Sequence, residues 1–235
     1  MKVAVMQPYF FPYLGYYSLI KYTDKFILFD VVQFIRHGWI ERNRILKPGD
    51  GWNYIAVPLE KHRRTVAINE VEIRNGEDWK GKIFRQLEHY KKKAPFYNDT
   101  LAVVESSLAI ETGSIVNLNA NILMQTCKYL GLPIDLQIYS EMNLKIGEAT
   151  YPGQWALNIS KALHAKEYLN PTGGMEIFAG NHFQKEGISL KFLGNNLRPY
   201  NQYRAAFEPG LSIIDVMMFN NVEDINKLVN DVYTT

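Results

Sequence analysis

"KVAVMQPYFFPYLGYYSLIKYTDKFILFD" (residues 2–30) decides the fold of this chain, because two short apolar runs flank a helical pattern. The runs at 2–7 and 25–30 predict buried strands, and the spacing of apolar residues in 15–24 predicts a helix. Strand, loop, helix and strand in this order begin an α/β layer. The prolines after the first strand exclude a continuing core strand there and indicate an ordered loop.

The rest of the chain returns to the same alternation after a helical segment. Further strands are expected at 52–59, 68–73, 133–139, 167–170 and 188–193. Helices are expected at 78–94, 98–110, 114–130, 153–165, 175–187, 211–220 and 222–233. We therefore predict one α/β domain over residues 1–235, with a mostly parallel sheet flanked by helices and a helical insertion or subdomain at about 76–131.

Composition excludes several classes of protein. A hydrophobic content of 47% and a charged content of 21% are typical of a folded protein, and a net charge of +2 does not indicate a nucleic-acid partner. The single cysteine, Cys127, excludes an internal disulfide, and its helical spacing predicts a buried thiol. No apolar run reaches the roughly 18 residues of a membrane helix, and no secretory signal is recognisable, so we expect a cytoplasmic protein without a membrane span.

The opening loop is the first of four candidate binding stretches. Ligands of open α/β sheets bind beyond the carboxyl ends of the strands, which is where this loop begins. Gln7 and Tyr9 are candidates for lining a pocket, because an amide and an aromatic ring can hold a sugar or a base. Phe10 and Phe11 are expected to fill the core beneath the loop instead.

The second stretch, "DVVQFIRHGWIERNRI" (30–45), follows the second predicted strand. Its candidate residues are Asp30, Gln33, Arg36, His37, Trp39, Asn43 and Arg44. Guanidinium groups bind phosphate, amides and carboxylates bind hydroxyls, and a tryptophan covers the apolar face of a sugar, so this set predicts a pocket for a phosphorylated sugar. The alternative is a surface helix with ion pairs around Glu41.

The remaining two stretches follow the later strands. In "YLNPTGG" (168–174), Asn170 precedes Gly173 and Gly174, which allow the backbone to approach a ligand; the alternative is a tight turn into a helix. In "RPYNQY" (198–203), the candidates are Tyr200 and Gln202.

Signatures of several enzyme classes are absent. The five histidines have no metal-ligand spacing, so no metal site is predicted. Only His37 and His182 lie near candidate loops, and Asp30 and His37 are our candidates for handling a proton. No Gly-x-Ser-x-Gly elbow and no phosphate-binding glycine–lysine loop occur, which excludes the common hydrolase and P-loop readings.

Several of these motifs resemble the WbqC-like family of bacterial surface-polysaccharide gene clusters. They are "MQPYFFPYLGYYSLI" (6–20), "VQF" (32–34) with "WIERNRI" (39–45), "YLNPTGG" (168–174) and "FEPGLSIIDVMMFN" (207–220). The positions that fit the family's motifs are Gln7, Pro8, Tyr9, Pro12, Tyr13, Gly15, Asp30, Gln33, Phe34, Trp39, Asn43 and Arg44. Val31 replaces an expected second acidic residue, which puts catalysis centred at that point in doubt.

The opening also resembles the first elements of nucleotidylyltransferases and pantothenate synthetase-like ligases, which implies a Rossmann-like sheet. The His-x-Gly-His signature of those enzymes reads Tyr13, Leu14, Gly15 and Tyr16 here. Both imidazoles are absent, so the resemblance implies the fold and not their chemistry with ATP.

The resemblance to the WbqC-like family implies a transferase of O-antigen biosynthesis that modifies a nucleotide-linked amino sugar by acyl or aminoacyl transfer. Tyr13 and the candidate residues of the four stretches would line its pocket. No cofactor is expected, and the acyl donor is left open. Two alternatives remain: a non-catalytic sugar-nucleotide-binding or scaffold protein, and a metal-independent glycosyltransferase. A homo-oligomer is compatible with the sequence.

Overall fold

The computed structural model describes all 235 residues and confirms the predicted α/β beginning. β1 (Lys2–Met6), α1 (Leu14–Lys21) and β2 (Lys25–Leu28) follow one another as strand, helix and strand. β1 and β2 pair in parallel along the whole of β2. Parallel strands are buried on both faces, which is why these two runs are apolar without alternation.

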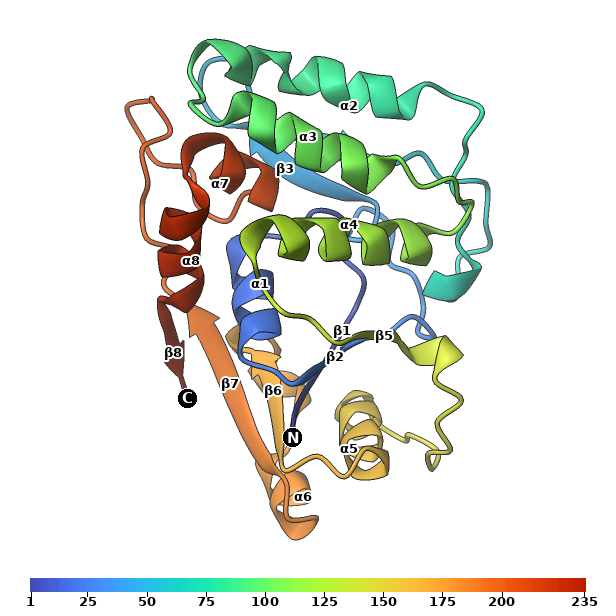
Figure 1. Cartoon of the computed structure of the whole chain (residues 1–235). Helices are drawn as coiled ribbons and strands as arrows, with labels where there is room; N and C mark the ends of the chain where they lie inside the picture. Colours follow the sequence, from blue (N-terminus) through green and yellow to red (C-terminus); the bar gives the residue numbers. More distant parts are fainter.

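Six strands form the main sheet, in the order β5-β2-β1-β6-β7-β8 (Figure 1). The later strands are β5 (Leu136–Ile138), β6 (Glu167–Pro171), β7 (Ser189–Asn195) and β8 (Val232–Thr234). All pairs are parallel except β7 with β8 at one edge. The predicted class, a Rossmann-like and mostly parallel sheet flanked by helices, is confirmed.

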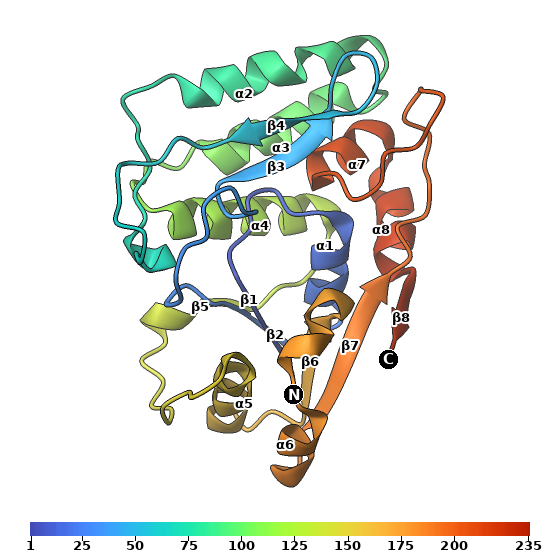
Figure 2. The same ribbon diagram turned by 180° about the vertical axis from the view of Figure 1, so that it is seen from behind.

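A hairpin and three helices lie between β2 and β5 in the chain. β3 (Arg42–Leu46) pairs antiparallel with β4 (Trp52–Ala56), and Figure 2 shows this hairpin next to α2. The three helices are α2 (Trp79–Leu87), α3 (Tyr97–Leu108) and α4 (Ile115–Leu130). As expected from the sequence, Ser114 caps α4 at its start and Gly131 ends it in the left-handed conformation.

The other helices complete the two faces of the sheet. The α-helices are α5 (Pro152–Ala162), α6 (Gly180–Lys185), α7 (Ile213–Phe219) and α8 (Val222–Asn230). The short 3-10 helices are η1 (Ile68–Glu70), η2 (Glu88–Lys92), η3 (Tyr139–Glu141) and η4 (Thr172–Ile177).

Alternate side chains of β1 pack on opposite faces of the sheet, since successive residues of a strand point in opposite directions. Val3 and Val5 pack with side chains of α5 and α6 in a small apolar cluster. Ala4 belongs to a larger cluster that includes buried side chains of α1, α2, α3, α4, α7 and α8. Figure 1 shows the corresponding arrangement, with α2, α3 and α4 on one side and α5 and α6 on the other.

Four predicted elements were wrong in detail. The predicted helix at 78–94 is divided into α2 and η2. Residues 68–73, predicted as a strand, contain η1 and only isolated bridges, because the backbone N–H groups of Ile68 and Asn69 bond to the loop after β2. The predicted helix at 175–187 is divided into the end of η4 and α6. The predicted helix at 222–233 ends at Asn230 and is followed by β8.

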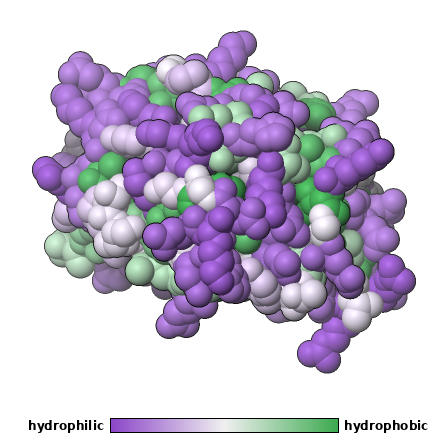
Figure 3. Space-filling model, turned by 90° about the horizontal axis from the view of Figure 1, so that it is seen from below, coloured by the Kyte–Doolittle hydropathy of each residue, from purple (hydrophilic) through white to green (hydrophobic).

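No helix is both long enough and apolar enough to cross a membrane. Seen from below, the surface is mainly hydrophilic, with small hydrophobic patches between the polar side chains (Figure 3).

Candidate functional site

The strand order places a crevice at the carboxyl end of β1. β1 is flanked by β2 on one side and by β6 on the other, so the connections leave in opposite directions at this point. Open α/β sheets bind ligands at such a switch point. A cavity of about 1200 Å³ lies there, which we call the central cavity. Its principal lining residues are Gln7, Tyr9, Tyr13, Gln33, Trp39, Asn43, Arg44, Tyr151, Trp155, Asn170, Gly173, Gly174 and Ile177.

The opening loop forms one wall of the central cavity and is held by side-chain amides. Asn43, which is 3% exposed, donates to the carbonyls of Phe10 and Phe11 at 3.0 and 2.9 Å. Asn119 of α4 donates to the carbonyl of Pro8 at 2.8 Å. Phe10 and Phe11 are fully buried below, as expected, and Phe11 has a φ of +38°. The loop is therefore a fixed part of the fold.

This fixed loop presents three of the predicted residues to the central cavity. The backbone carbonyl of Gln7 accepts a hydrogen bond from the Tyr16 hydroxyl at 2.8 Å, while its side-chain amide has no partner in the protein. The Tyr9 ring lies against Tyr16, with ring centroids 5.6 Å apart. Burial raises the pKa of Tyr9 and Tyr13, so both phenols are neutral hydrogen-bonding groups.

Arg44 is the one charged residue that lines the central cavity. Its guanidinium lies between the rings of Trp39 and Trp52, at 5.4 and 5.2 Å from their centroids, and one nitrogen donates to the carbonyl of Gly210 at 3.0 Å. Its Nε is buried without a partner. A cation held between two aromatic faces is well placed to bind one anionic group of a ligand.

The end of β6 contributes the opposite wall. Asn170 is 7% exposed, accepts a hydrogen bond from Tyr168 at 3.2 Å and donates to the carbonyl of Pro171 at 3.0 Å. A Cβ at Gly174 would lie 2.2 Å from the Asn170 amide nitrogen, so only glycine fits there without displacement. Gly173 has open space around it. Gln33 also lines the cavity and donates to the carbonyl of Arg64 at 3.0 Å.

Sequence reasoning missed the wall formed by the start of α5 and by η4. Tyr151, Trp155 and Ile177 line the cavity from these elements. Trp155 packs on Phe29 at the end of β2, with ring centroids 5.3 Å apart. The aromatic pair in "TYPGQW" (150–155) is the signal that could have indicated this wall. It follows no predicted strand directly, so a pattern that places sites at strand ends does not select it.

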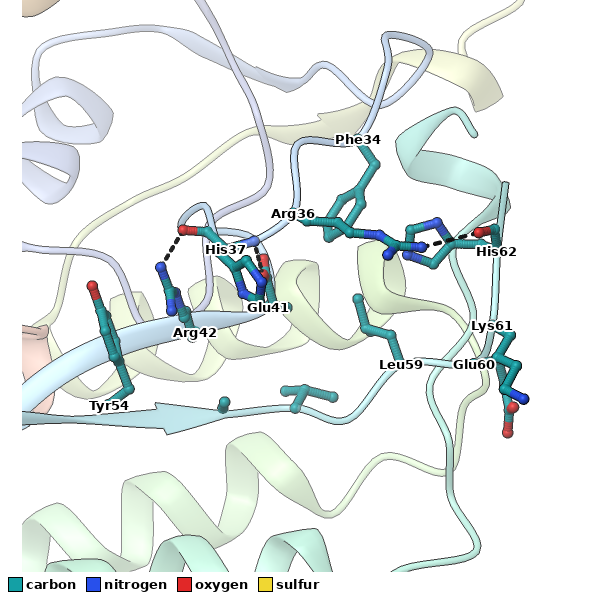
Figure 4. A pocket seen from close by; sticks show the side chains of 12 residues that line it. Phe34, Arg36, His37, Glu41, Arg42, Tyr54, Leu59, Glu60, Lys61 and His62 are labelled. Atoms are coloured by element: carbon teal, nitrogen blue, oxygen red, sulfur yellow. Dashed lines mark hydrogen bonds between the residues drawn. The ribbon is translucent and has the colours of Figure 1, made fainter. Parts of the chain in front are cut away.

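Arg36 and His37 line a separate pocket of about 440 Å³ between the loop after β2 and the β3–β4 hairpin, which we call the side pocket (Figure 4). His37 has a φ of +61°; its backbone N–H donates to the carboxylate of Glu41, and its carbonyl accepts from Arg42. Arg36 donates to the carbonyl of His62 at 3.1 Å. Burial raises the pKa of Glu41, whose second oxygen has no partner.

Asp30 lies behind the central cavity and does not line it. Its carboxylate is 1% exposed and accepts hydrogen bonds from the backbone N–H and the hydroxyl of Ser140, at 3.1 and 2.6 Å. Through these bonds it joins the end of β2 to η3. The structure thus separates Asp30 and His37 from each other and from the central cavity.

Tyr200 and Gln202 surround the buried carboxylate of Asp215, outside the central cavity. The Tyr200 hydroxyl and the Gln202 amide donate to one oxygen at 2.6 and 2.9 Å, and the Tyr90 hydroxyl donates to the other at 2.7 Å. Burial raises the pKa of Asp215 to about 6. These bonds attach the segment after β7 to α7, and Leu197 and Gly210 at its two ends reach the central cavity.

The central cavity is thus a large, mainly apolar space that includes several aromatic rings, neutral amides and phenols and one arginine, and no carboxylate, lysine, histidine or cysteine lines it. No three His, Cys, Asp or Glu side chains come together as a group that could hold a metal ion. Fold and site define a Rossmann-like α/β protein whose switch-point cavity offers aromatic faces and one guanidinium group.

Comparison with known proteins gives the family. The chain belongs to the WbqC-like protein family, whose model matches residues 7–227. It is 30% identical over 222 residues to the uncharacterized protein Rv1507c of Mycobacterium tuberculosis (strain ATCC 25618 / H37Rv), covering 93% of each chain. No solved structure matches it.

Proposed function

We propose that this protein is a transferase that binds a nucleotide-linked amino sugar in the central cavity and modifies it by acyl or aminoacyl transfer, in surface-polysaccharide biosynthesis. The observation that carries the proposal is the position and lining of the central cavity. Its volume of about 1200 Å³ exceeds what one small ring needs and accommodates a nucleotide and a sugar together.

The lining matches the parts of such a ligand. Aromatic side chains such as Tyr9, Trp39 and Trp155 offer faces for a base and a sugar ring, and the amides of Gln7 and Asn170 offer bonds to hydroxyl groups. Arg44 supplies the positive charge that a phosphate requires. Asp30 and His37 do not line the cavity. Either residue could therefore affect a bound ligand only indirectly, by positioning the loop at 31–36.

Thermal denaturation of the purified protein tests the proposal with ATP, coenzyme A and UDP-, dTDP- and GDP-linked sugars with and without an amino group. A ligand at about 100 times its Kd adds roughly 2.7 kcal/mol to the free energy of unfolding, which is a clear shift in Tm. We expect a shift with one amino-sugar nucleotide, its loss in Arg44→Gln, and its retention in Arg42→Gln, whose side chain stacks on Tyr54 in the side pocket. Equal shifts in both variants, or no shift with any sugar nucleotide, would contradict the proposal.

The second candidate is a sugar-nucleotide-binding protein without activity. One observation favours it: none of the side chains that line the central cavity is a carboxylate, an imidazole or a lysine, the groups that most often transfer protons. Mass spectrometry of the bound sugar nucleotide, incubated with acyl thioesters or aminoacyl adenylates, separates the two. An acylated sugar supports the transferase, and an unchanged one supports the binding protein.

A further inference from the structure

Four phenols line the central cavity, and only one of them is bonded to a base. The hydroxyl of Tyr151 lies 2.6 Å from Nδ1 of His182. Tyr168 is bonded to an amide oxygen, that of Asn170, and the hydroxyls of the two phenols in the opening loop have no partner. His182 itself does not line the cavity, so Tyr151 lies between it and the cavity.

The pair is held by a close approach of two segments far apart in the sequence. Tyr151 is the N-cap residue of α5, and His182 belongs to α6. Gly153 in the first turn of α5 touches the end of η4: a Cβ there would lie 2.6 Å from the carbonyl oxygen of Ile177. Gln154 fixes the segment before the tyrosine by accepting bonds from Thr150 at 2.7 and 2.9 Å. The rings of the pair lie 5.3 Å apart.

No charged side chain competes for the imidazole. His182 is half-buried and forms no ion pair and no other side-chain hydrogen bond. On its own helix Lys185 is exposed, and Glu186 just after the helix pairs with Lys161 at 2.7 Å. Histidine is the side chain that most often accepts a proton in catalysis, and Nδ1 of this imidazole faces the phenol hydroxyl.

We propose that Tyr151 and His182 are the proton-transfer pair of the central cavity. As the amine or hydroxyl of the bound sugar attacks the acyl donor, its proton passes to the Tyr151 oxygen while the phenol proton passes to Nδ1 of His182. One proton moves along the pair and leaves an imidazolium ion, and it returns by the same route to the group that leaves the acyl donor. Tyr151 is the catalytic residue, and His182 acts through it. The proposal rests on the proposed transferase function and supplies the base that the cavity lining lacks.

The same hydrogen bond would exist if it only joined α6 to the start of α5. A structural bond needs a partner of the right shape, whereas a relay needs a partner that accepts a proton near neutral pH. His182→Asn separates these roles, because the asparagine side chain places a polar atom near the position of Nδ1 and does not titrate. His164→Asn is the matched control: His164 is exposed and has a φ of +54°, which asparagine tolerates.

The test measures acetylation of individual tyrosines by N-acetylimidazole in the full-length protein, resolved by peptide mass spectrometry, and needs no sugar. We expect Tyr151 to react at pH 7.5 at least tenfold faster in the wild type and in His164→Asn than in His182→Asn. The exposed Tyr203 and Tyr233 should react equally in all three. The pH profile of the Tyr151 rate should differ between the wild type and His182→Asn, because only the wild type carries the imidazole at this position.

Equal Tyr151 acetylation rates in the wild type and His182→Asn, with unchanged circular dichroism, would overturn the proposal that the two residues form a proton-transfer pair. Superimposable pH profiles of the Tyr151 rate in the wild type and His182→Asn would overturn it too. The outcome is independent of the ligand screen: a failed screen with a His182-dependent rate refutes the proposed substrate and keeps the pair. A successful screen with His182-independent acetylation keeps the substrate and refutes the pair.

Discussion

Replacing Asp215 by asparagine should remove a pH-dependent part of the stability. The Asp215 carboxylate is 0% exposed and accepts three hydrogen bonds, from Tyr90, Tyr200 and Gln202. Burial raises its pKa from 3.8 to about 6, and the hydrogen bonds from the two phenols and the amide offset only part of that effect. The charged form is therefore less favourable in the folded protein than in the unfolded chain.

The magnitude follows from the difference between the two pKa values. A difference of about two units corresponds to about 3 kcal/mol at 1.36 kcal/mol per unit. Because the folded protein binds the proton more tightly, the free energy of unfolding rises as the pH falls. The cost of the buried charge is present in full above about pH 7 and disappears as the pH falls from about 6 to about 4.

Urea denaturation of the wild type and Asp215→Asn at half-unit intervals from pH 4 to pH 7.5 measures this contribution. The other ionisable groups are common to both proteins, so the difference between the two curves isolates Asp215. We expect the wild type to gain about 3 kcal/mol relative to the variant between pH 7 and pH 4. Parallel curves, or a relative loss by the wild type on acidification, would refute the reasoning.

Three further predictions concern packing and burial. Gly153→Val should destabilise the fold by about 1–3 kcal/mol, and Gly153→Ala by less, because the added carbon meets the Ile177 carbonyl; chemical denaturation of the two variants measures this. Asn43→Ala should cost about 2 kcal/mol or more, because two buried carbonyls of the opening loop lose their donor, whereas the exposed Asn53→Ala on the same hairpin should be close to neutral by the same assay. Cys127, whose pKa burial raises to about 12, should not react with a thiol reagent in the folded protein and should react on unfolding, followed by absorbance.

Local sequence patterns predicted the elements whose strand or helix pattern depends on residues close together in the chain. The apolar runs at 2–7 and 25–30 became β1 and β2, and the cap and terminating glycine of α4 are where the sequence placed them. The strand predicted at 68–73 was wrong because its apolar side chains, Ile68, Val71 and Ile73, pack in the main core while its backbone bonds to loops rather than to a sheet. The strand at 42–46 was missed because it contains polar residues where a buried strand is expected to be apolar. One of them, Asn43, donates hydrogen bonds to the opening loop.

The candidate site residues fall into two groups, those that line the central cavity and those that lie elsewhere. Ten of the fifteen candidate site residues line the central cavity, because the carboxyl ends of β1, β2 and β6 meet there: Gln7, Tyr9, Tyr13, Gln33, Trp39, Asn43, Arg44, Asn170, Gly173 and Gly174. The remaining five, Asp30, Arg36, His37, Tyr200 and Gln202, lie elsewhere. Their side-chain types are equally suited to a sugar phosphate, so nothing in the sequence distinguished them from the first group.

The sequence by itself determined the class of fold, because strand burial, helix caps and the stiff opening loop depend on residues close together in the chain. The tertiary structure alone decided that β6 lies beside β1, since parallel strands pair across long connections that local patterns do not specify. That pairing creates the switch point and the central cavity. The close approach of the start of α5 to the end of η4 in turn accompanies the hydrogen bond between Tyr151 and His182, 31 positions further along the chain.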